Sequence, residues 1–323
     1  MLGDPTGIGP EQCARVLADG RLADAARLLV IGDARVLAQG ARDAGVEVGD
    51  VEVIDLHNCD PARLPRGAVS AESGRVVGET LKYMVDFALT GKVDGITFAP
   101  LNKAALNAGG WRFNDEHQMF AHFTRHAGFF GEMNVLDNTW MSRVTSHVSL
   151  RTALDQITPE RIDAALTLAD ATMRGAGFEN PRIAVCALNP HGGENGLFGS
   201  EEIEVIRPAV EKAAARGIAC KGPFPSDTVF LKAFAGEFDG VLSMYHDQGQ
   251  IATKLKGFNR GVTVTGGLET IFTTPAHGTA FDIVGKGTAT TGALESAIRL
   301  CARLAEFRRS GRLRTQAPAR GPI

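Results

Sequence analysis

Arg27-Leu-Leu-Val-Ile-Gly32 is an apolar run that is followed at once by an amphipathic segment from Ala34 to Ala44, and then by Val51-Glu-Val-Ile-Asp55. The first and third runs are short and rich in β-branched or apolar residues, so they predict strands. The middle segment has helical spacing and stops before Gly45, which is a common helix stop. A strand, a helix and a strand in this order indicate a parallel pair with a right-handed crossover. This stretch places the chain in the α/β class.

The same alternation continues along most of the chain. A long helix is predicted from Ala71 to Thr90 and a buried strand from Asp94 to Ala99. Further strands are expected at 182–187, 240–244 and 261–265, and further helices at 160–175, 201–216 and 292–309. Strands spaced by helices predict parallel pairing throughout the sheet.

Composition and charge exclude several classes of protein. A chain of 323 residues suggests two domains. The formal net charge of −3 argues against a nucleic-acid partner. No apolar run is long enough for a membrane span, so no membrane partner is expected. The five cysteines are odd in number and form no Cys-x-x-Cys pair. They resemble reduced thiols, and the expected location is the cytoplasm.

Three histidines follow strand-like runs in polar settings, namely Thr145-Ser-His147, Asn189-Pro-His191 and Tyr245-His246-Asp247. Parallel sheets gather their chemistry at the carboxyl ends of the strands. Three imidazoles that converge there would bind a divalent metal and leave one coordination position open for substrate. The alternative is that each histidine only caps a loop.

A glycine-rich turn opens the chain, Gly3-Asp-Pro-Thr-Gly-Ile-Gly-Pro-Glu11. It could cradle a phosphate on the first N–H groups of a helix, although it matches neither the dinucleotide fingerprint nor the Walker loop. A tight structural turn is an equal alternative. Such a turn normally follows a strand, and only Met1 and Leu2 precede it here. We therefore expect a strand upstream of Met1.

A second glycine-rich stretch is His277-Gly-Thr-Ala-Phe-Asp282-Ile-Val-Gly285-Lys-Gly287. It resembles the His-Gly-Ser-Ala-Pro-Asp-Ile-Ala-Gly-Lys-Gly loop of the isopropylmalate and isocitrate dehydrogenases. The resemblance implies that the loop wraps the adenosine half of a nicotinamide cofactor, with His277 and Gly278 at the adenine and Asp282 on the ribose hydroxyls. A carboxylate accepts hydroxyl hydrogen bonds and repels a 2′-phosphate, which favours NAD over NADP.

Several motifs in order resemble one family of that superfamily, 4-hydroxythreonine-4-phosphate dehydrogenase and its relatives. Besides the turn, the three histidine segments and the 277–280 loop, they are Ala99-Pro-Leu-Asn-Lys103 and Gly222-Pro-Phe-Pro-Ser-Asp227-Thr. The match runs from Gly3 to about Leu304. It implies an isocitrate/isopropylmalate dehydrogenase-like fold with two α/β domains and a cleft between them. Residues 1–100 and 250–323 would form the cofactor-side domain, and residues 101–249 the metal and dimerisation domain.

The resemblance also implies the chemistry. His147, His191 and His246 would bind zinc, magnesium, manganese or cobalt at a site shared between the two subunits of a homodimer. An anionic 3-hydroxy acid would be oxidised by NAD and then decarboxylated.

The catalytic candidates are two aspartates and a lysine. Asp227 and Asp247 lie beside the ligand segments and could orient imidazole N–H groups, or they could only cap turns. Lys103 could bind an anionic group or assist proton transfer. Lys254 matches the family's substrate-binding lysine.

The substrate pocket departs from the family pattern. Pyridoxine-pathway members carry Asn and Arg where this chain has Thr263 and Phe272, and Phe lacks the fork that binds phosphate or carboxylate. The family's Gly-His-Thr-Glu motif appears as Asp115-Glu116-His117-Gln118, in which His117 and Gln118 are the substrate-binding candidates. Added acids disfavour a phosphate. The alternatives to 4-hydroxythreonine 4-phosphate are threonate or erythronate 4-phosphate and an aromatic cis-dihydrodiol carboxylate.

Two other classes stay open on the residues alone. A metal-dependent hydrolase could use three histidines together with Asp247. A non-catalytic binding protein would account for the lost arginine.

Overall fold

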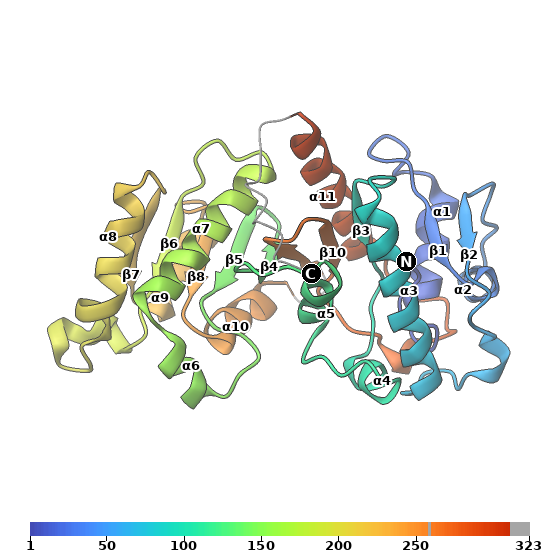
Figure 1. The fold of residues 1–323 in the computed structure, drawn as a ribbon, viewed down its shortest axis with the longest axis horizontal. Helices are drawn as coiled ribbons and strands as arrows, with labels where there is room; N and C mark the ends of the chain where they lie inside the picture. Colours follow the sequence, from blue (N-terminus) through green and yellow to red (C-terminus); the bar gives the residue numbers. More distant parts are fainter. Residues whose placement is uncertain (258–259, 311–323) are drawn as a thin grey trace.

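The computed structural model describes residues 1–257 and 260–310 as an elongated, two-lobed α/β structure. In Figure 1, β1, β2 and helices α1–α3 lie at one end, and β6, β7, α8 and α9 lie at the other. β4, β10 and α11 lie between them. The expected α/β fold with two lobes is confirmed.

Eleven α-helices are assigned among the described residues. They are α1 (Gly9–Asp19), α2 (Ala34–Ala44), α3 (Ala71–Leu89), α4 (Lys103–Ala108), α5 (Glu116–Phe123), α6 (Leu150–Gln156), α7 (Pro159–Gly175), α8 (Arg207–Ala215), α9 (Ser226–Phe234), α10 (His246–Gly257) and α11 (Gly292–Arg309). The shorter turns are η1 (Pro61–Arg63), η2 (Pro190–Gly196), the π-helical η3 (Glu202–Ile206) and η4 (Phe281–Ile283).

The strands form a pair and one large sheet. They are β1 (Val30–Gly32), β2 (Val53–Asp55), β3 (Gly95–Thr97), β4 (Gly131–Leu136), β5 (Thr139–Arg143), β6 (Ile183–Cys186), β7 (Cys220–Phe224), β8 (Gly240–Ser243), β9 (Val262–Gly266) and β10 (Ile271–Pro275). β1 and β2 pair in parallel, and the other eight follow the order β3-β10-β9-β4-β5-β8-β6-β7.

The expectation of parallel pairing throughout was wrong for the middle of the sheet. β4 is antiparallel to β5 and to β9, and β9 is antiparallel to β10. β4 and β5 are joined by the two-residue turn Asp137-Asn138, in which Asp137 has a φ of 53°. Such a short connection can only join antiparallel strands, because a parallel pair needs a long crossover.

Local sequence explains where the predicted helices begin and end. Asp33 caps α2 by accepting a hydrogen bond from the backbone of Arg35, and Gly45 ends the helix in the left-handed conformation. Ser70 caps α3 in the same way. The predicted 201–216 helix was only partly right, because its first turn is the π-helical η3 and α8 follows from Arg207.

Among the apolar cores of the described residues, the two largest lie one on the large sheet and one under α3 and α5. The larger core packs α7, α8 and α11 on strands of the large sheet around residues such as Leu166, Val185 and Leu242. The second core lies under α3 and α5 and contains Phe120 and Phe272, whose rings stack with centroids 4.1 Å apart. Phe272 is therefore a core residue that is only 1% exposed.

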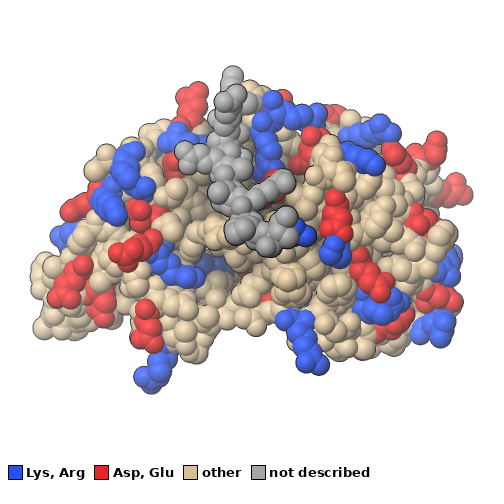
Figure 2. Space-filling view, viewed as in Figure 1, with Lys and Arg blue, Asp and Glu red and all other residues tan. Residues whose placement is uncertain are grey.

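The proposed division into domains stays a prediction. β9, from the predicted cofactor-side domain, pairs directly with β4, from the other predicted domain, so one sheet runs through both. Part of the predicted 250–323 segment, residues 258–259 and 311–323, lies outside the described residues. Figure 2 shows acidic and basic side chains interspersed over the described part of this face. None of the described helices combines the length and the apolar character needed to cross a bilayer.

A test of the packing between helices is Gly74→Ala. A Cβ atom at Gly74 would lie 1.7 Å from the carbonyl oxygen of Ala105, so α3 and α4 would have to move apart. We expect a loss of about 2 kcal/mol or more in the free energy of unfolding, measured by urea denaturation. Gly49→Ala is the control, because a Cβ atom there meets nothing within 4 Å. Equal stability of the two variants would contradict this close approach.

Candidate active site

The three histidine segments leave three neighbouring strands of the large sheet at the same edge. β5, β8 and β6 are adjacent and mutually parallel. His147 follows β5, His246 follows β8 and His191 follows β6. The carboxyl ends of parallel strands lie on one side of a sheet, which is where α/β proteins bind ligands.

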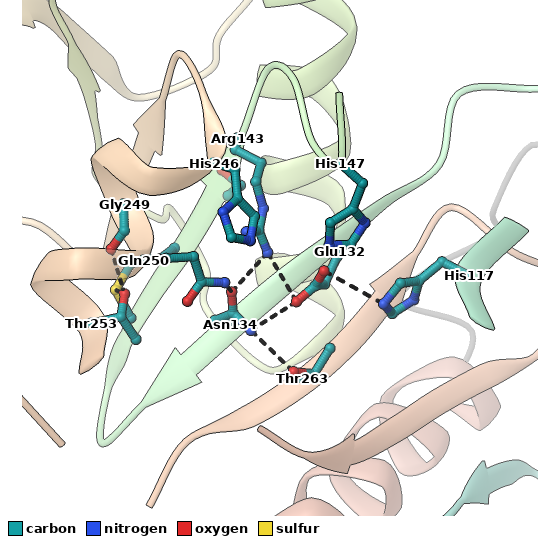
Figure 3. Close-up of polar contacts among 12 residues, drawn as sticks. His117, Glu132, Asn134, Arg143, His147, His246, Gly249, Gln250, Thr253 and Thr263 are labelled. Carbon is teal, nitrogen blue, oxygen red and sulfur yellow. Dashed lines mark hydrogen bonds and ion pairs between the residues drawn. The ribbon is translucent and has the colours of Figure 1, made fainter. Parts of the chain in front are cut away.

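His147 and His246 lie side by side, with ring centroids 5.4 Å apart (Figure 3). The Nδ1 atom of His147 is 2.7 Å from Asp115 Oδ2, and that of His246 is 2.7 Å from Asp247 Oδ1. A carboxylate only accepts hydrogen bonds, so each Nδ1 donates and each Nε2 keeps its lone pair. Metal-binding histidines are oriented by carboxylates in this way. The pair fits two ligands of a divalent ion.

Burial keeps His246 in the form that binds a metal. Desolvation lowers the pKa of this histidine from its ordinary value, against the hydrogen bond to Asp247, which raises it. For Asp115, burial alone would raise the pKa, but the hydrogen bond from His147 and the nearby His117 hold it below its usual range. Asp115 therefore stays ionised and fixes the ring of His147.

His191 is not beside the other two histidines in the single chain. It is the second residue of the η2 turn, has a φ of 54° and is exposed, and its ring centroid lies 6.3 Å from that of Phe198. Glu202 Oε1 holds this loop by accepting 2.7 Å hydrogen bonds from the backbone of Leu188 and Asn189. Within the described part of one chain, no three histidine, cysteine or acidic side chains are grouped so as to hold a metal. The three-histidine site stays a prediction.

A cavity of about 260 Å³ lies in front of the histidine pair. It brings together residues from α4, α5, β4, α10, β9 and the 277–280 loop. Its polar lining includes Lys103, Glu116, Glu132, Asn134, His147, His246, Lys254, Thr263 and His277, and Gly278 also lines it. Predicted metal-, substrate- and cofactor-binding residues thus share one cavity.

Glu132 is the centre of a buried polar network (Figure 3). Its Oε1 atom forms an ion pair with Arg143 Nη2 at 2.9 Å and accepts a hydrogen bond from Asn134 Nδ2 at 3.1 Å. Asn134 also donates to Thr263 Oγ1 at 3.0 Å. Burial would raise the pKa of Glu132, but the charge of Arg143, followed by those of His117 and His147, holds it well below its usual range. Glu132 is therefore a fixed anion at the cavity wall.

Glu116 is a second carboxylate of the cavity, with 9% of its surface exposed. Its Oε2 atom lies 3.4 Å from Lys103 Nζ. No hydrogen bond reaches that oxygen from the described residues. Lys103 and Glu116 thus form an ion pair whose carboxylate has capacity left for a substrate group.

Besides His191 and Asp247, five predicted site residues do not line this cavity. His117 is buried, with Nδ1 2.6 Å from Thr265 Oγ1, and together with the exposed Gln118 it lines an adjoining hollow. Phe272 is in the core. Asp227 is exposed in the first turn of α9, and Asp282 is exposed in η4. The cavity lining includes none of these five, and their assigned roles stay predictions.

The sequence interpretation did not select five polar cavity residues that the structure brings into the site, namely Glu116, Glu132, Asn134, Gln250 and Thr253. A pattern was visible for four of them. Glu132 and Asn134 alternate on the otherwise apolar β4, so both point to one face. Gln250 and Thr253 follow His246 along α10 at helical spacing. Polar residues that repeat with the period of a strand or helix were the available signal.

A two-lobed α/β fold with a histidine pair, lysines and a glycine-rich loop around one cavity defines a dehydrogenase-type enzyme. The model of the family described as "Pyridoxal phosphate biosynthetic protein PdxA" matches residues 14–301. The chain belongs to this family. Its relatives are named dehydrogenases, and it is an oxidoreductase acting on a hydroxyl group.

The similar proteins cover nearly the whole chain. The Pseudomonas aeruginosa protein named "Putative 4-hydroxythreonine-4-phosphate dehydrogenase 2" is 46% identical, over 94% of this chain and 95% of its own. The D-threonate 4-phosphate dehydrogenase of Pectobacterium atrosepticum is 38% identical, over 94% and 98%. The crystal structure of a 4-hydroxythreonine-4-phosphate dehydrogenase from Burkholderia phymatum has a TM-score of 0.77 at 40% identity, covering 94% and 96%.

Arg143→Met tests the buried ion pair. Arg143 and Glu132 have side chains that are 5% and 13% exposed, so the variant leaves a buried carboxylate without its cation. We expect a loss of about 3–5 kcal/mol in the free energy of unfolding at pH 7. In the wild type the pKa of Glu132 is lowered in the folded state. The ionised Glu132 therefore contributes to the free energy of unfolding above the ordinary glutamate pKa of about 4.3, and this contribution is lost as the pH falls. The deficit of the variant should therefore shrink in acid.

Urea denaturation at several pH values measures this effect. Arg182→Met is the matched control, because its ion pair with Asp239 has an arginine side chain that is 51% exposed. That variant should lose less than about 1 kcal/mol. An Arg143→Met deficit no larger than that of the control would contradict a stabilising buried pair.

Phe272→Leu separates packing from substrate binding. The loss of the ring stacked on Phe120 should lower the free energy of unfolding by about 1–3 kcal/mol. Phe272 does not line the cavity. The KM for substrate should therefore stay within about twofold of the wild-type value, which corresponds to about 0.4 kcal/mol of free energy. A large rise in KM with unchanged stability would instead put the ring in contact with substrate.

Proposed function

We propose that the chain is an NAD-dependent and divalent-metal-dependent dehydrogenase that oxidises a 3-hydroxy acid 4-phosphate, with decarboxylation of the product. The substrate class is that of 4-hydroxythreonine 4-phosphate or threonate 4-phosphate, after which the similar proteins are named. The observation that carries the proposal is the shared cavity, where the carboxylate-oriented histidines face Lys103, Lys254 and the His277 loop.

The two lysines provide the positive charge for an anionic substrate. Lys103 begins α4 and Lys254 lies on the last turn of α10, and both line the cavity. Each presents an ammonium group that can bind a carboxylate or phosphate oxygen. Thr263, fixed by Asn134, presents a hydroxyl group to the same space.

The reaction needs one proton acceptor and one hydride acceptor. NAD, when bound, would supply the hydride acceptor for C3 of the substrate, and the hydroxyl proton would leave through the Lys103–Glu116 pair. Lys103 passes a proton to the unbonded Oε2 of Glu116 as it takes the one from the hydroxyl group. The resulting β-keto carboxylate loses carbon dioxide, and the enolate that remains takes up a proton at carbon to give the ketone.

The metal would be held by the Nε2 atoms of His147 and His246, with His191 of a second copy as third ligand in a homodimer. Nitrogen ligands of this type suit zinc and the related divalent ions. Such an ion supplies a positive charge that polarises the hydroxyl group and steadies the enolate. Asp115 and Asp247 keep both rings in the required orientation.

The expected location is the cytoplasm.

NAD would be bound by the loop that carries His277, Gly278 and Asp282. His277 and Gly278 lie on the cavity wall, and the exposed Asp282 is available to accept hydrogen bonds from ribose hydroxyls.

A second substrate class is favoured by the acids of the cavity. Glu116 and Glu132 add negative charge where a phosphate would have to lie, and they suit hydroxyl donors instead. A similar solved structure, the terephthalate 1,2-cis-dihydrodiol dehydrogenase of Burkholderia xenovorans, has a TM-score of 0.66 at 26% identity, over 94% of this chain and 96% of that one. An aromatic dihydrodiol carboxylate is therefore the competing proposal.

A panel of 3-hydroxy acids, phosphorylated and unphosphorylated, tests the function when NADH formation is followed with NAD and added divalent metal. We expect turnover of a four-carbon acid 4-phosphate. His246→Ala should reduce turnover by more than roughly a hundredfold. It should also lower the amount of metal that the purified protein retains, measured by elemental analysis. His122→Ala is the control, because this exposed histidine lies outside the cavity. Turnover of only the dihydrodiol would select the competing class, and full activity of His246→Ala would refute the metal role.

A further inference from the structure

The opening glycine-rich turn is the support of the 277–290 loop. The backbone N–H of Ile8 donates to the carbonyl of Thr279 at 3.1 Å. A Cβ atom at Gly7 would lie 2.9 Å from the Cβ of Thr279, so the loop can approach only because position 7 is glycine. The turn is buried under the loop rather than open to a phosphate. Of the two alternatives for this motif, the geometry favours the structural one.

The first turns of α1 hold the far end of the same loop. Glu11, only 1% exposed, accepts from the backbone N–H of Ala289 at 3.0 Å and pairs with Arg15 at 3.3 Å. Arg15 Nη2 donates in turn to the carbonyl of Gly287 at 2.6 Å. The C-terminal end of the loop, at Gly287 and Ala289, is thus attached to α1.

Gln12 contacts both ends of the 277–290 loop. Its side chain is fully buried, and its Nε2 donates to the carbonyl of Thr290 at 2.7 Å. The same nitrogen lies 3.3 Å from His277 Nε2. A carbonyl only accepts, so the amide must turn its nitrogen towards Thr290, and its second N–H faces His277.

This arrangement determines where the proton of His277 sits. Since Gln12 donates to Nε2, that ring atom must carry the lone pair and Nδ1 must carry the hydrogen. Nδ1 lies 3.0 Å from the carbonyl of Gly278, which can accept that hydrogen. Both ring nitrogens then have partners, and the ring, on the cavity wall, has only its faces left for a ligand.

We propose that Gln12 is a positioning residue that favours the Nδ1–H tautomer of His277 and fixes its ring plane for stacking against the flat base of the dinucleotide. The proposal rests on the proposed function in one respect, that the loop binds NAD. Stacking on a fixed aromatic face does not require hydrogen bonds from the ring. Gln12 contacts the loop and not the cofactor, so it should affect cofactor affinity and not the chemical step.

The direct test is the tautomer of His277, read from long-range ¹H–¹⁵N NMR spectra of the cofactor-free protein. The His277 signals are assigned by their loss in His277→Gln. We expect the Nδ1–H form in the wild type and a shift towards the Nε2–H form in Gln12→Met, which keeps the length of the side chain and removes its donors. Gln156→Met, at the end of α6 in the other lobe, should give the wild-type spectrum.

The second measurement is NADH affinity, followed by fluorescence titration. Gln12→Met should weaken binding roughly three- to tenfold, the equivalent of about one hydrogen bond. The KM for NAD should rise by a similar factor while kcat and the KM for the hydroxy acid stay unchanged.

Several results would overturn the proposal. A wild-type His277 with its hydrogen on Nε2 would do so without any variant, even if Gln12→Met fails to fold. An unchanged tautomer or unchanged NADH affinity in a folded Gln12→Met would do so too. Failure of the wild type to bind NADH would contradict the proposed function instead, and it would refute the stacking role of His277 while the tautomer measurement still decides the contact with Gln12.

Discussion

The parallel pairing of β5, β8 and β6 is the constraint on which the site depends. Their backbone hydrogen bonds set neighbouring strand ends one strand spacing apart, about 4.8 Å. His147 and His246, which leave β5 and β8, therefore meet with ring centroids 5.4 Å apart. No contact between the two rings is needed to bring them together. His191 leaves β6 on a longer turn and is exposed, so the same sheet edge presents two histidines to the cavity and one to the surface.

Carboxylates determine what the paired histidines can do. Asp115 comes from the cap of α5 and Asp247 from the first turn of α10, so two separate elements orient the two rings. Both Nδ1 atoms are occupied, and only the Nε2 atoms are left for a ligand. This arrangement is the one that the proposed metal site requires.

The cavity combines two opposite electrostatic demands. Lys103 and Lys254 suit an anionic hydroxy acid, whereas Glu116 and Glu132 restrict how much negative charge can enter. Glu132 forms a buried ion pair with Arg143, so the positive charge of Arg143 compensates most of its negative charge. Glu116 retains an oxygen without a hydrogen bond. The balance between these groups, rather than any single residue, decides between a phosphorylated and an unphosphorylated substrate.

The alternation of apolar runs and amphipathic segments was enough to predict the α/β class and five of the eleven described helices, namely α2, α3, α7, α8 and α11, because periodicity is a local property of the sequence. The motifs identified the family and put His147, His246 and His277 at strand or loop ends. The sequence could not show that β4 and β9 are antiparallel, that Phe272 is buried against Phe120, or that Gln12 lies under His277. Those facts depend on contacts between residues more than a hundred positions apart, and only the packed tertiary structure decides them, because side-chain neighbours across the sheet are not encoded in local spacing.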